Sequence, residues 1–365
     1  MRINRSIHPK KVVLWSFVLF LVTACNPTQV AVSPTPTLTL HPTDTLTPAF
    51  PATATFTPPP LPTDTPALVV PCFVTYIDPF AFLPDSLNLL VRANKGVQQF
   101  NLQTMQQEQF INSPSNLNGP VVAISPDGEV LAWALEDGTV QLTRISDQAV
   151  LTNITPGQVS PIKLEFSPAG DRLFSASHDG TLKVWDMEGN LLNGFQPGGG
   201  EFMNIGLSHD GTMLATIPSD GEITLWNADN FKIITGLSSS GGYDTSDVVF
   251  SPDGEYIAAD LATGLFLWKL PDRTELLGAS SAINSMAAAY SPDGSLLAYS
   301  DLNHIVLSSP DGSQILRTLE GHRSPIFELL FSPDGSTLVS ADDMEIRVWR
   351  VEDGELLAIG KSACP

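Results

Sequence analysis

Histidine, cysteine and carboxylate residues are the side chains of this chain that could bind a metal or act in catalysis. Four histidines, His178, His209, His304 and His322, lie far apart in the sequence. None belongs to a His-x-Glu pair, and no paired cysteines give the spacing of a zinc site. Asp-Gly pairs are common, but the Asp-x-Asp-x-Asp-Gly spacing of a calcium loop is missing. The sequence therefore predicts no cofactor, no metal site, no catalytic residue and no enzymatic activity.

The chain begins with a segment typical of export. Basic residues up to Lys11 precede an apolar run from Val12 to Val22, which has the length of a secretory signal and is short for a membrane span. The run ends in Val22-Thr23-Ala24-Cys25, which resembles the lipobox of bacterial lipoproteins. The resemblance implies that residues 1–24 are removed and that Cys25 carries the acyl chains, palmitate among them. An ordinary signal peptide with a cysteine nearby by chance is the alternative.

Threonine and proline dominate the stretch that follows Cys25. Segments such as Phe56-Thr-Pro-Pro-Pro60 contain too few apolar residues to form a hydrophobic core, and proline favours an extended chain. Residues 25–67 are therefore predicted to be a lipidated, disordered stalk. We expect an extracytoplasmic location, with membrane contact through the lipid anchor only.

Acidic residues outnumber basic ones by 39 to 18, which gives a formal net charge of −21. Binding to nucleic acid depends on clustered Lys and Arg side chains that displace counterions from phosphates. Nucleic acid is therefore excluded as an expected partner.

A four-residue turn recurs through the rest of the chain. Ser-Pro-Asp-Gly begins at Ser125, Ser251, Ser291 and Ser332, with variants at Ser167 and Ser208 and a degenerate copy at Leu83. The spacing is close to the period of about 40 to 45 residues expected for four-stranded propeller blades. Residues 68–365 are therefore predicted to form an all-β, seven-bladed β-propeller of four-stranded antiparallel blades.

The repeats resemble those of the WD-repeat family. Val184-Trp185-Asp186 is its signature, variants end at Asn227, Lys269 and Arg350, and Gly321-His322 matches its glycine-histidine element. Asn101, Thr143 and Ser308 stand where tryptophan is expected. The resemblance implies a buried structural network, here carried over to His322, Ser340, Asp343 and Trp349.

The ends of the ring must also be joined, because an open propeller exposes strand edges. In members of the family an N-terminal strand usually completes the last blade. Here the seventh repeat contains its own fourth strand, Glu355 to Ile359, which puts that strand exchange in question. Cys72 and Cys364 lie at the two ends of the propeller. In an oxidising exterior they are positioned to form a disulfide, with two free thiols as the alternative.

Loops that connect successive blades gather on one face, and in the family that face often receives proteins or peptides. Phe202 and Tyr243 lie in the longer loops and are anchors of the type found in binding hot spots, although both could instead cover blade packing. We expect a monomeric interaction scaffold with an unidentified protein or peptide partner. Two alternatives stay open: a hydrolase or lactonase with a metal on the propeller axis, and a structural envelope role resembling the Tol propeller.

Overall fold

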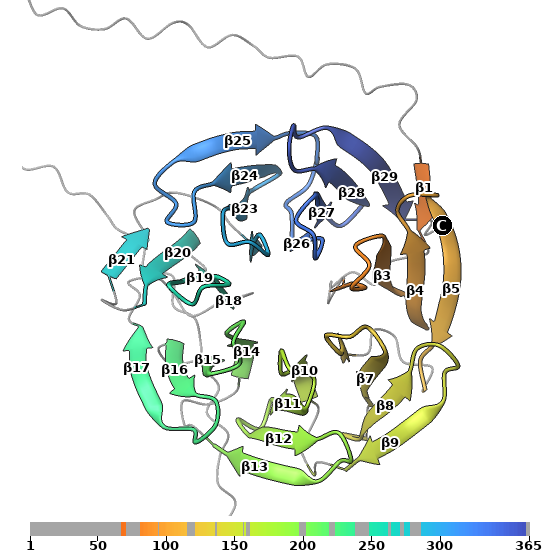
Figure 1. Cartoon of the computed structure of the whole chain (residues 1–365), viewed down its shortest axis with the longest axis vertical. Coiled ribbons are helices and arrows are strands. Elements are labelled where there is room, and N and C mark those ends of the chain that lie inside the picture. The colour runs from red at the N-terminus through yellow and green to blue at the C-terminus, as the bar shows by residue number, and fades with distance from the viewer. Residues whose placement is uncertain are drawn as a thin grey trace, which may run out of the picture. The chain divides into compact units, whose positions relative to one another are not determined.

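The computed structural model shows seven β-sheets arranged in a ring (Figure 1). The described residues are 67–70, 81–93, 95–114, 121–135, 137–155, 157, 161–196, 202–218, 223–237, 248–261, 264–270, 274–277 and 286–362. Within the strands, the structure describes the backbone but not the side chains of residues 67–70, 161–162, 202–203, 218 and 361–362. In this part of the chain no helix is long and apolar enough to cross a membrane.

Seven sheets form the seven blades, which we number along the chain. Blade 1 contains β2 (Ala81–Phe82), β3 (Asn88–Ala93), β4 (Gly96–Asn101) and β5 (Gln106–Asn112). Blade 2 contains β6 (Val121–Ile124), β7 (Val130–Ala134), β8 (Val140–Arg144) and β9 (Val150–Ile154). Blade 3 contains β10 (Pro161–Phe166), β11 (Arg172–Ser177), β12 (Leu182–Asp186) and β13 (Leu191–Phe195). Blade 4 contains β14 (Phe202–Leu207), β15 (Met213–Pro218), β16 (Ile223–Asn227) and β17 (Ile233–Leu237).

The remaining blades follow the same order. Blade 5 contains β18 (Val248–Phe250), β19 (Tyr256–Leu261), β20 (Gly264–Lys269) and β21 (Thr274–Leu277). Blade 6 contains β22 (Ala288–Tyr290), β23 (Leu297–Asp301), β24 (His304–Ser308) and β25 (Ile315–Leu319). Blade 7 contains β26 (Glu328–Phe331), β27 (Thr337–Ala341), β28 (Glu345–Arg350), β29 (Leu356–Ser362) and the N-terminal β1 (Ala67–Val70).

Each blade is an antiparallel meander whose first strand faces the ring axis and whose fourth strand lies at the rim (Figure 1). This arrangement confirms the predicted all-β, seven-bladed propeller. Because the strands alternate in direction, the turns between the second and third strands lie on the same face as the connections between blades. We call this face the loop face.

The recurring turn is held by its own side chains. In blade 2, the Ser125 hydroxyl donates to the Asp127 carboxylate at 2.5 Å and accepts from the Val130 amide at 2.9 Å. The same carboxylate accepts from the Glu129 amide at 3.0 Å. The hydrogen bonds from Ser125 and Glu129 lower the pKa of Asp127. The turn therefore stabilises itself without tertiary partners, which explains why so short a motif recurs.

Hydrophobic cores lie between blades, not inside them. Seven buried clusters are found in the described residues, and each combines side chains of two neighbouring blades. One of them packs Leu89 and Phe100 of blade 1 against Val339 and Val348 of blade 7. A blade buries its faces only when both neighbours are present, so the ring is the smallest unit that is fully packed.

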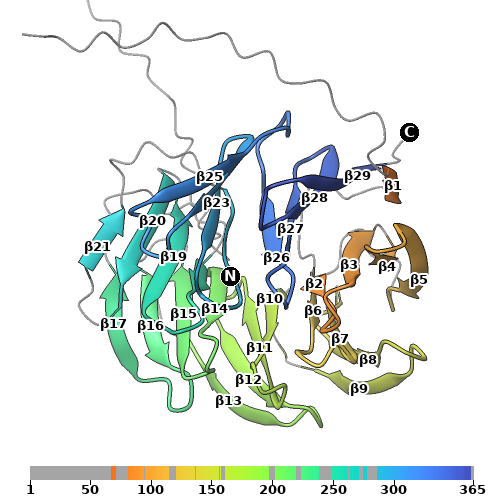
Figure 2. The same cartoon turned by 45° about the horizontal axis from the view of Figure 1, so that its top comes forward.

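The N-terminal strand takes part in ring closure after all. Strand β1 pairs in parallel with β29 as a fifth strand of blade 7, with Ala67 opposite Ile359 and Val70 opposite Ser362 (Figure 2). The fourth strand predicted for the seventh repeat is also present, so β1 adds to this blade and does not replace a missing strand. A further link joins the turns of blades 7 and 1, where the Asp334 amide donates to the Ser86 hydroxyl at 3.0 Å.

One alignment within the repeats was wrong. Tryptophan pairs with the first core residue after the turn, as Trp185 does with Leu173 and Trp349 with Leu338. In blade 1 the equivalent partner of Leu89 is Phe100 and not Asn101. Blade 1 thus has a fully buried aromatic residue at this place.

Candidate functional site

The innermost strands surround a cavity on the propeller axis, which we call the axial channel. Its volume is about 680 Å³, and residues of all seven blades line it. At the position two residues before each turn stand Ala81, Ala123, Glu165, Gly206, Val249, Ala289 and Leu330. Because four of these seven residues are alanine or glycine, the channel remains open at this level.

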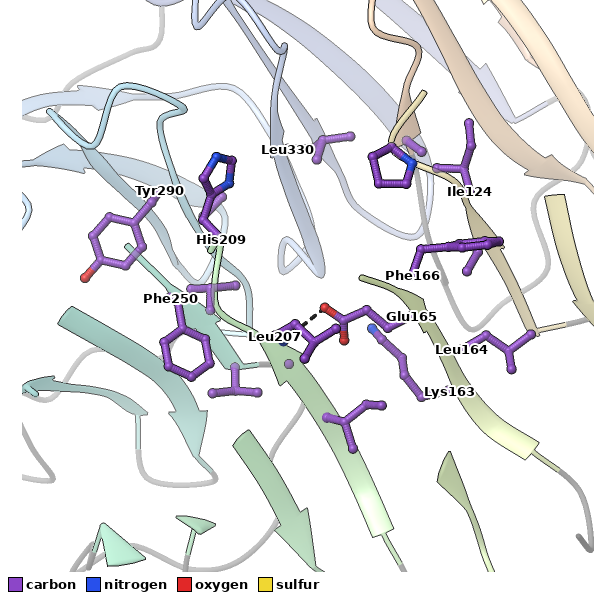
Figure 3. Close-up of a pocket in the computed structure, with 18 of the residues that line it drawn as sticks. Ile124, Lys163, Leu164, Glu165, Phe166, Leu207, His209, Phe250, Tyr290 and Leu330 are labelled. Carbon is purple, nitrogen blue, oxygen red and sulfur yellow. Dashed lines mark hydrogen bonds between the residues drawn. The ribbon is translucent and has the colours of Figure 1, made fainter. Parts of the chain in front are cut away.

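Charged side chains enter the channel from two blades. Lys163 and Glu165 lie on β10, and Glu328 lies on β26 at the opposite side of the ring (Figure 1). Figure 3 shows Lys163 and Glu165 directed into the same part of the channel. The Glu165 carboxylate accepts from the Leu207 amide of blade 4 at 3.0 Å, which fixes its position across the blade boundary. The channel therefore has an apolar wall with three charged groups.

One histidine stands at the turn end of the channel. His209 occupies the position that proline has in Ser-Pro-Asp-Gly, and it lines the cavity beside Pro252. It is exposed to solvent, as is His178 in its turn. Figure 3 also shows Tyr290 of blade 6 on the wall, separated from His209 by blade 5; the Tyr290 hydroxyl donates to the Pro310 carbonyl at 3.2 Å. Burial raises the pKa of Tyr290, with smaller contributions from nearby negative charges.

A metal on the axis has no matching ligand set among the described residues. Within them, the one group of three or more His, Cys, Asp and Glu side chains with ligand atoms within 4.8 Å of one another is His322, Asp342 and Glu345. None of these three lines the axial channel. Both His322 nitrogens are hydrogen-bonded, and Glu345 accepts from the Arg347 guanidinium at 2.6 Å. A nearby guanidinium repels a cation, so this group is better described as a structural network.

The structural network predicted for the last repeat is present with one different member. His322 Nδ1 lies 2.8 Å from Asp342, and His322 Nε2 lies 2.7 Å from the Ser340 hydroxyl. Trp349 Nε1 donates to the same hydroxyl at 2.8 Å. The carboxylate is that of Asp342 and not of Asp343, which is exposed. Neighbouring residues at a strand end point in opposite directions, so Asp342 points inward and Asp343, the residue predicted from the sequence, points outward.

Asp342 is held in its ionised form. Burial alone would raise its pKa, but hydrogen bonds from His322 and from the Met344 and Glu345 amides outweigh burial and lower the pKa. The anion can accept a hydrogen bond from Nδ1 of His322, which lies 2.8 Å away. The network anchors the connection between blades 6 and 7, because His322 also offers its carbonyl to Asn303 at 2.8 Å.

In two other blades a tryptophan indole likewise donates to a buried hydroxyl. Trp185 Nε1 donates to Ser175 at 3.0 Å in blade 3, and Trp226 Nε1 donates to Thr216 at 2.8 Å in blade 4. In both blades the Ser or Thr hydroxyl provides the hydrogen-bond acceptor that the buried indole N–H group would otherwise find in water. Their role is structural.

Several predicted site residues lie outside the described part of the chain. These are Cys25, Cys72, Cys364, Tyr243 and the side chain of Phe202. Of Phe202 the structure shows only that it begins β14. The structure therefore leaves the predicted anchors and cysteines as predictions.

Exposed apolar side chains on the loop face were missed at the sequence level. Met286, Leu302 and Met344 are 40%, 50% and 63% exposed, and we call them the loop-face patch. Leu302 and Met344 lie in the turns between the second and third strands of blades 6 and 7, and the Met286 amide donates to Ser300, near Leu302. The available signal was an apolar residue in a turn, where polar residues are usual.

Comparisons with known proteins agree with this geometry. The model of the family described as "WD domain, G-beta repeat" matches residues 151–186 and 313–350. A WD repeat-containing protein of Schistosoma mansoni is 28% identical over 191 residues, which cover 51% of this chain and 63% of that protein.

Two further relatives match shorter regions. An uncharacterized WD repeat-containing protein of Synechocystis is 29% identical over 39% of this chain and 42% of its own length. A COMPASS component of Saccharomyces cerevisiae is 26% identical over 39% of this chain and 47% of its own length. The chain thus spans less than two thirds of the relatives it matches. With two matched repeats and seven four-stranded blades, these similarities support a WD-repeat propeller.

Proposed function

We propose that this chain is a non-catalytic scaffold that binds a protein or peptide at its loop face. The observation that carries the proposal is the loop-face patch, Met286, Leu302 and Met344, on a rigid ring. These side chains lie on the same face, and Leu302 and Met344 occupy equivalent turns of neighbouring blades; an exposed apolar patch of this kind is a feature of interaction sites. Hydrogen bonds hold this patch in place, since the Leu302 carbonyl accepts from the Ile326 amide at 2.9 Å.

The relatives support the same class of function. The yeast relative is named as a component of the COMPASS assembly. For this chain we infer only the general use of a propeller as a binding platform, with a partner that supplies an apolar segment to the loop-face patch.

A capture experiment with two variants tests this proposal. The full-length protein and the double variant Leu302→Asn, Met344→Gln are compared in proximity labelling from native membranes. Leu302 has a φ of 55°, which asparagine tolerates, so the fold should be preserved. The matched control is Ile233→Asn, which removes an apolar side chain that is 64% exposed on the outer strand of blade 4. We expect loss of a specific partner in the double variant only; equal capture by all three proteins would refute the loop face as the binding site.

We further propose that the propeller is tethered outside the cytoplasm through acylated Cys25 and a stalk over residues 25–67. The support is the apolar run and lipobox-like end described from the sequence. Two or more acyl chains on one residue would give stable membrane binding. In phase partition with a non-ionic detergent, the protein should enter the detergent phase and Cys25→Ala the aqueous phase. A Cys25→Ala protein that stays in the detergent phase would contradict the proposal.

We also propose that Cys72 and Cys364 are joined by a disulfide. Both lie outside the described residues, but the strands that precede them are paired in parallel, and Val70 lies opposite Ser362. Each cysteine is two residues beyond that pair along its own strand direction. The register of β1 and β29 therefore favours this pairing over two distant thiols.

A further inference from the structure

We propose that the axial channel binds a small organic cation, an ammonium or guanidinium group attached to an apolar body. This site is separate from the loop face and goes beyond the scaffold function. The argument rests on the size, the lining and the charges of the channel.

The size of the channel fits a small molecule. Its volume of about 680 Å³ falls within the range of about 300 to 1,000 Å³ typical of ligand pockets. The wall at the level of Glu165 is made by alanine, valine and leucine side chains and by the backbone of Gly206. Such a wall binds an apolar body by excluding water from both surfaces.

The charges of the channel favour a cation. Two carboxylates are found among the described lining residues, Glu165 on β10 and Glu328 on β26 at the opposite side of the ring, against one lysine or arginine, Lys163, which Figure 3 shows beside Glu165. The lining therefore carries more carboxylates than basic side chains. Glu165 is held by the Leu207 amide at 3.0 Å, so the carboxylate is fixed before a ligand arrives. A fixed carboxylate in an apolar wall interacts with an ammonium group more strongly than it would in water.

The entrance at the turn end of the channel is also surrounded by negative charge. Asp127, Asp253, Asp293 and Asp334 belong to the turns whose prolines line this end of the channel. The whole chain carries a net charge of −21. Acidic groups around a cleft raise the local concentration of cations and repel anions. A metal ion is a poorer occupant, because the lining offers no group of converging ligand atoms within the described residues.

Three probes with the same ring system test the class of ligand. The probes are 1-naphthylmethylammonium, 1-naphthalenemethanol and 1-naphthoate, and binding to the full-length protein is measured by isothermal titration calorimetry. We expect the ammonium probe to bind about tenfold or more tightly than the alcohol, which corresponds to one charge-assisted contact. The naphthoate should bind most weakly. Equal affinities of the ammonium and alcohol probes, or no binding of either, would overturn the proposal.

Variants locate the site. Glu165→Gln combined with Glu328→Gln should reduce the affinity for the ammonium probe to that for the alcohol or below it, because Lys163 remains, and should leave the affinity for the alcohol unchanged. Val249→Trp combined with Leu330→Trp narrows the channel and should weaken both probes. The control Glu320→Gln removes an exposed carboxylate that does not line the channel and should change nothing. Thermal melting of each variant verifies folding, and ammonium binding that persists in the narrowed channel would overturn the proposal. Partner capture through the loop-face patch is a separate readout and does not depend on these results.

Discussion

The hydroxyl of Ser340 connects two buried side chains, so its removal gives a sharp test of the network in blade 7. Ser340 is fully buried and is hydrogen-bonded to both His322 Nε2 and Trp349 Nε1. Ser340→Ala leaves two buried polar groups without this partner. Each unsatisfied group costs about 1–3 kcal/mol, so the expected loss in the free energy of unfolding is about 2–6 kcal/mol.

Thr216→Val in blade 4 is the matched comparison. Thr216 is also buried and accepts a hydrogen bond from Trp226 Nε1, but no histidine completes the network there. Valine keeps the shape of threonine, so about 1–3 kcal/mol is expected from one lost partner. The assay is urea unfolding followed by circular dichroism and tryptophan fluorescence, in which unchanged slopes show that the midpoints report stability. If Ser340→Ala lowers the midpoint no more than Thr216→Val, the bond to His322 adds nothing and this reasoning fails.

Three further predictions concern the turns, the acid response and the cysteines. Gly128→Ala should lower the melting temperature more than Gly170→Ala does. Both glycines have a positive φ, but only at Gly128 would the new Cβ atom lie 2.6 Å from a proline of the preceding blade. Equal decreases in melting temperature would mean that the neighbouring turn moves to make room. Because its pKa is lowered in the folded state, Asp342 stabilises above the unfolded value of 3.8 and loses this contribution as pH falls through the folded pKa. Asp342→Asn should therefore reduce stability near pH 7 and lose less of it in acid than the wild type, and parallel pH curves would contradict this. For Cys72 and Cys364, mass spectrometry should show alkylation only after reduction, and reductant should lower the melting temperature, since closing a loop of nearly 300 residues contributes about 5 kcal/mol in the chain-entropy model; alkylation of both without reduction would exclude the disulfide.

The fold could be predicted from the sequence because its turns are stabilised by hydrogen bonds between residues close in the chain. The bonds between Ser125 and Asp127 lie within a few residues and recur wherever the same types stand at the same spacing. Even the degenerate copy at Leu83 forms its turn, where Asp85 accepts from the Leu87 and Asn88 amides. A regular period of such turns predicts equivalent sheets arranged about an axis.

The same local chemistry also misleads. Ser309-Pro310-Asp311-Gly312 has the sequence of the blade-starting turn, yet it joins β24 to β25, the third and fourth strands of blade 6. The turn itself is alike in both places, because Ser309 donates to Asp311 at 2.6 Å. Which hairpin a turn closes depends on strand pairing, which the four residues do not encode.

Single-residue assignments at the ends of strands depended on the tertiary structure. The carboxylate of the network is Asp342 and not Asp343, and the buried aromatic residue of blade 1 is Phe100 and not Asn101. A shift by one residue turns a side chain to the other face of a strand, so hairpin length decides such cases.

The sequence by itself determined the blades, their number and their turns, since each depends on interactions between residues close in the chain. Only the tertiary structure decided how the ring is closed, with β1 added beside β29, and which side chains meet across blades, as Glu165 and the Leu207 amide do. The axial channel belongs to this second group, because it exists only where seven inner strands converge and no single repeat contains it.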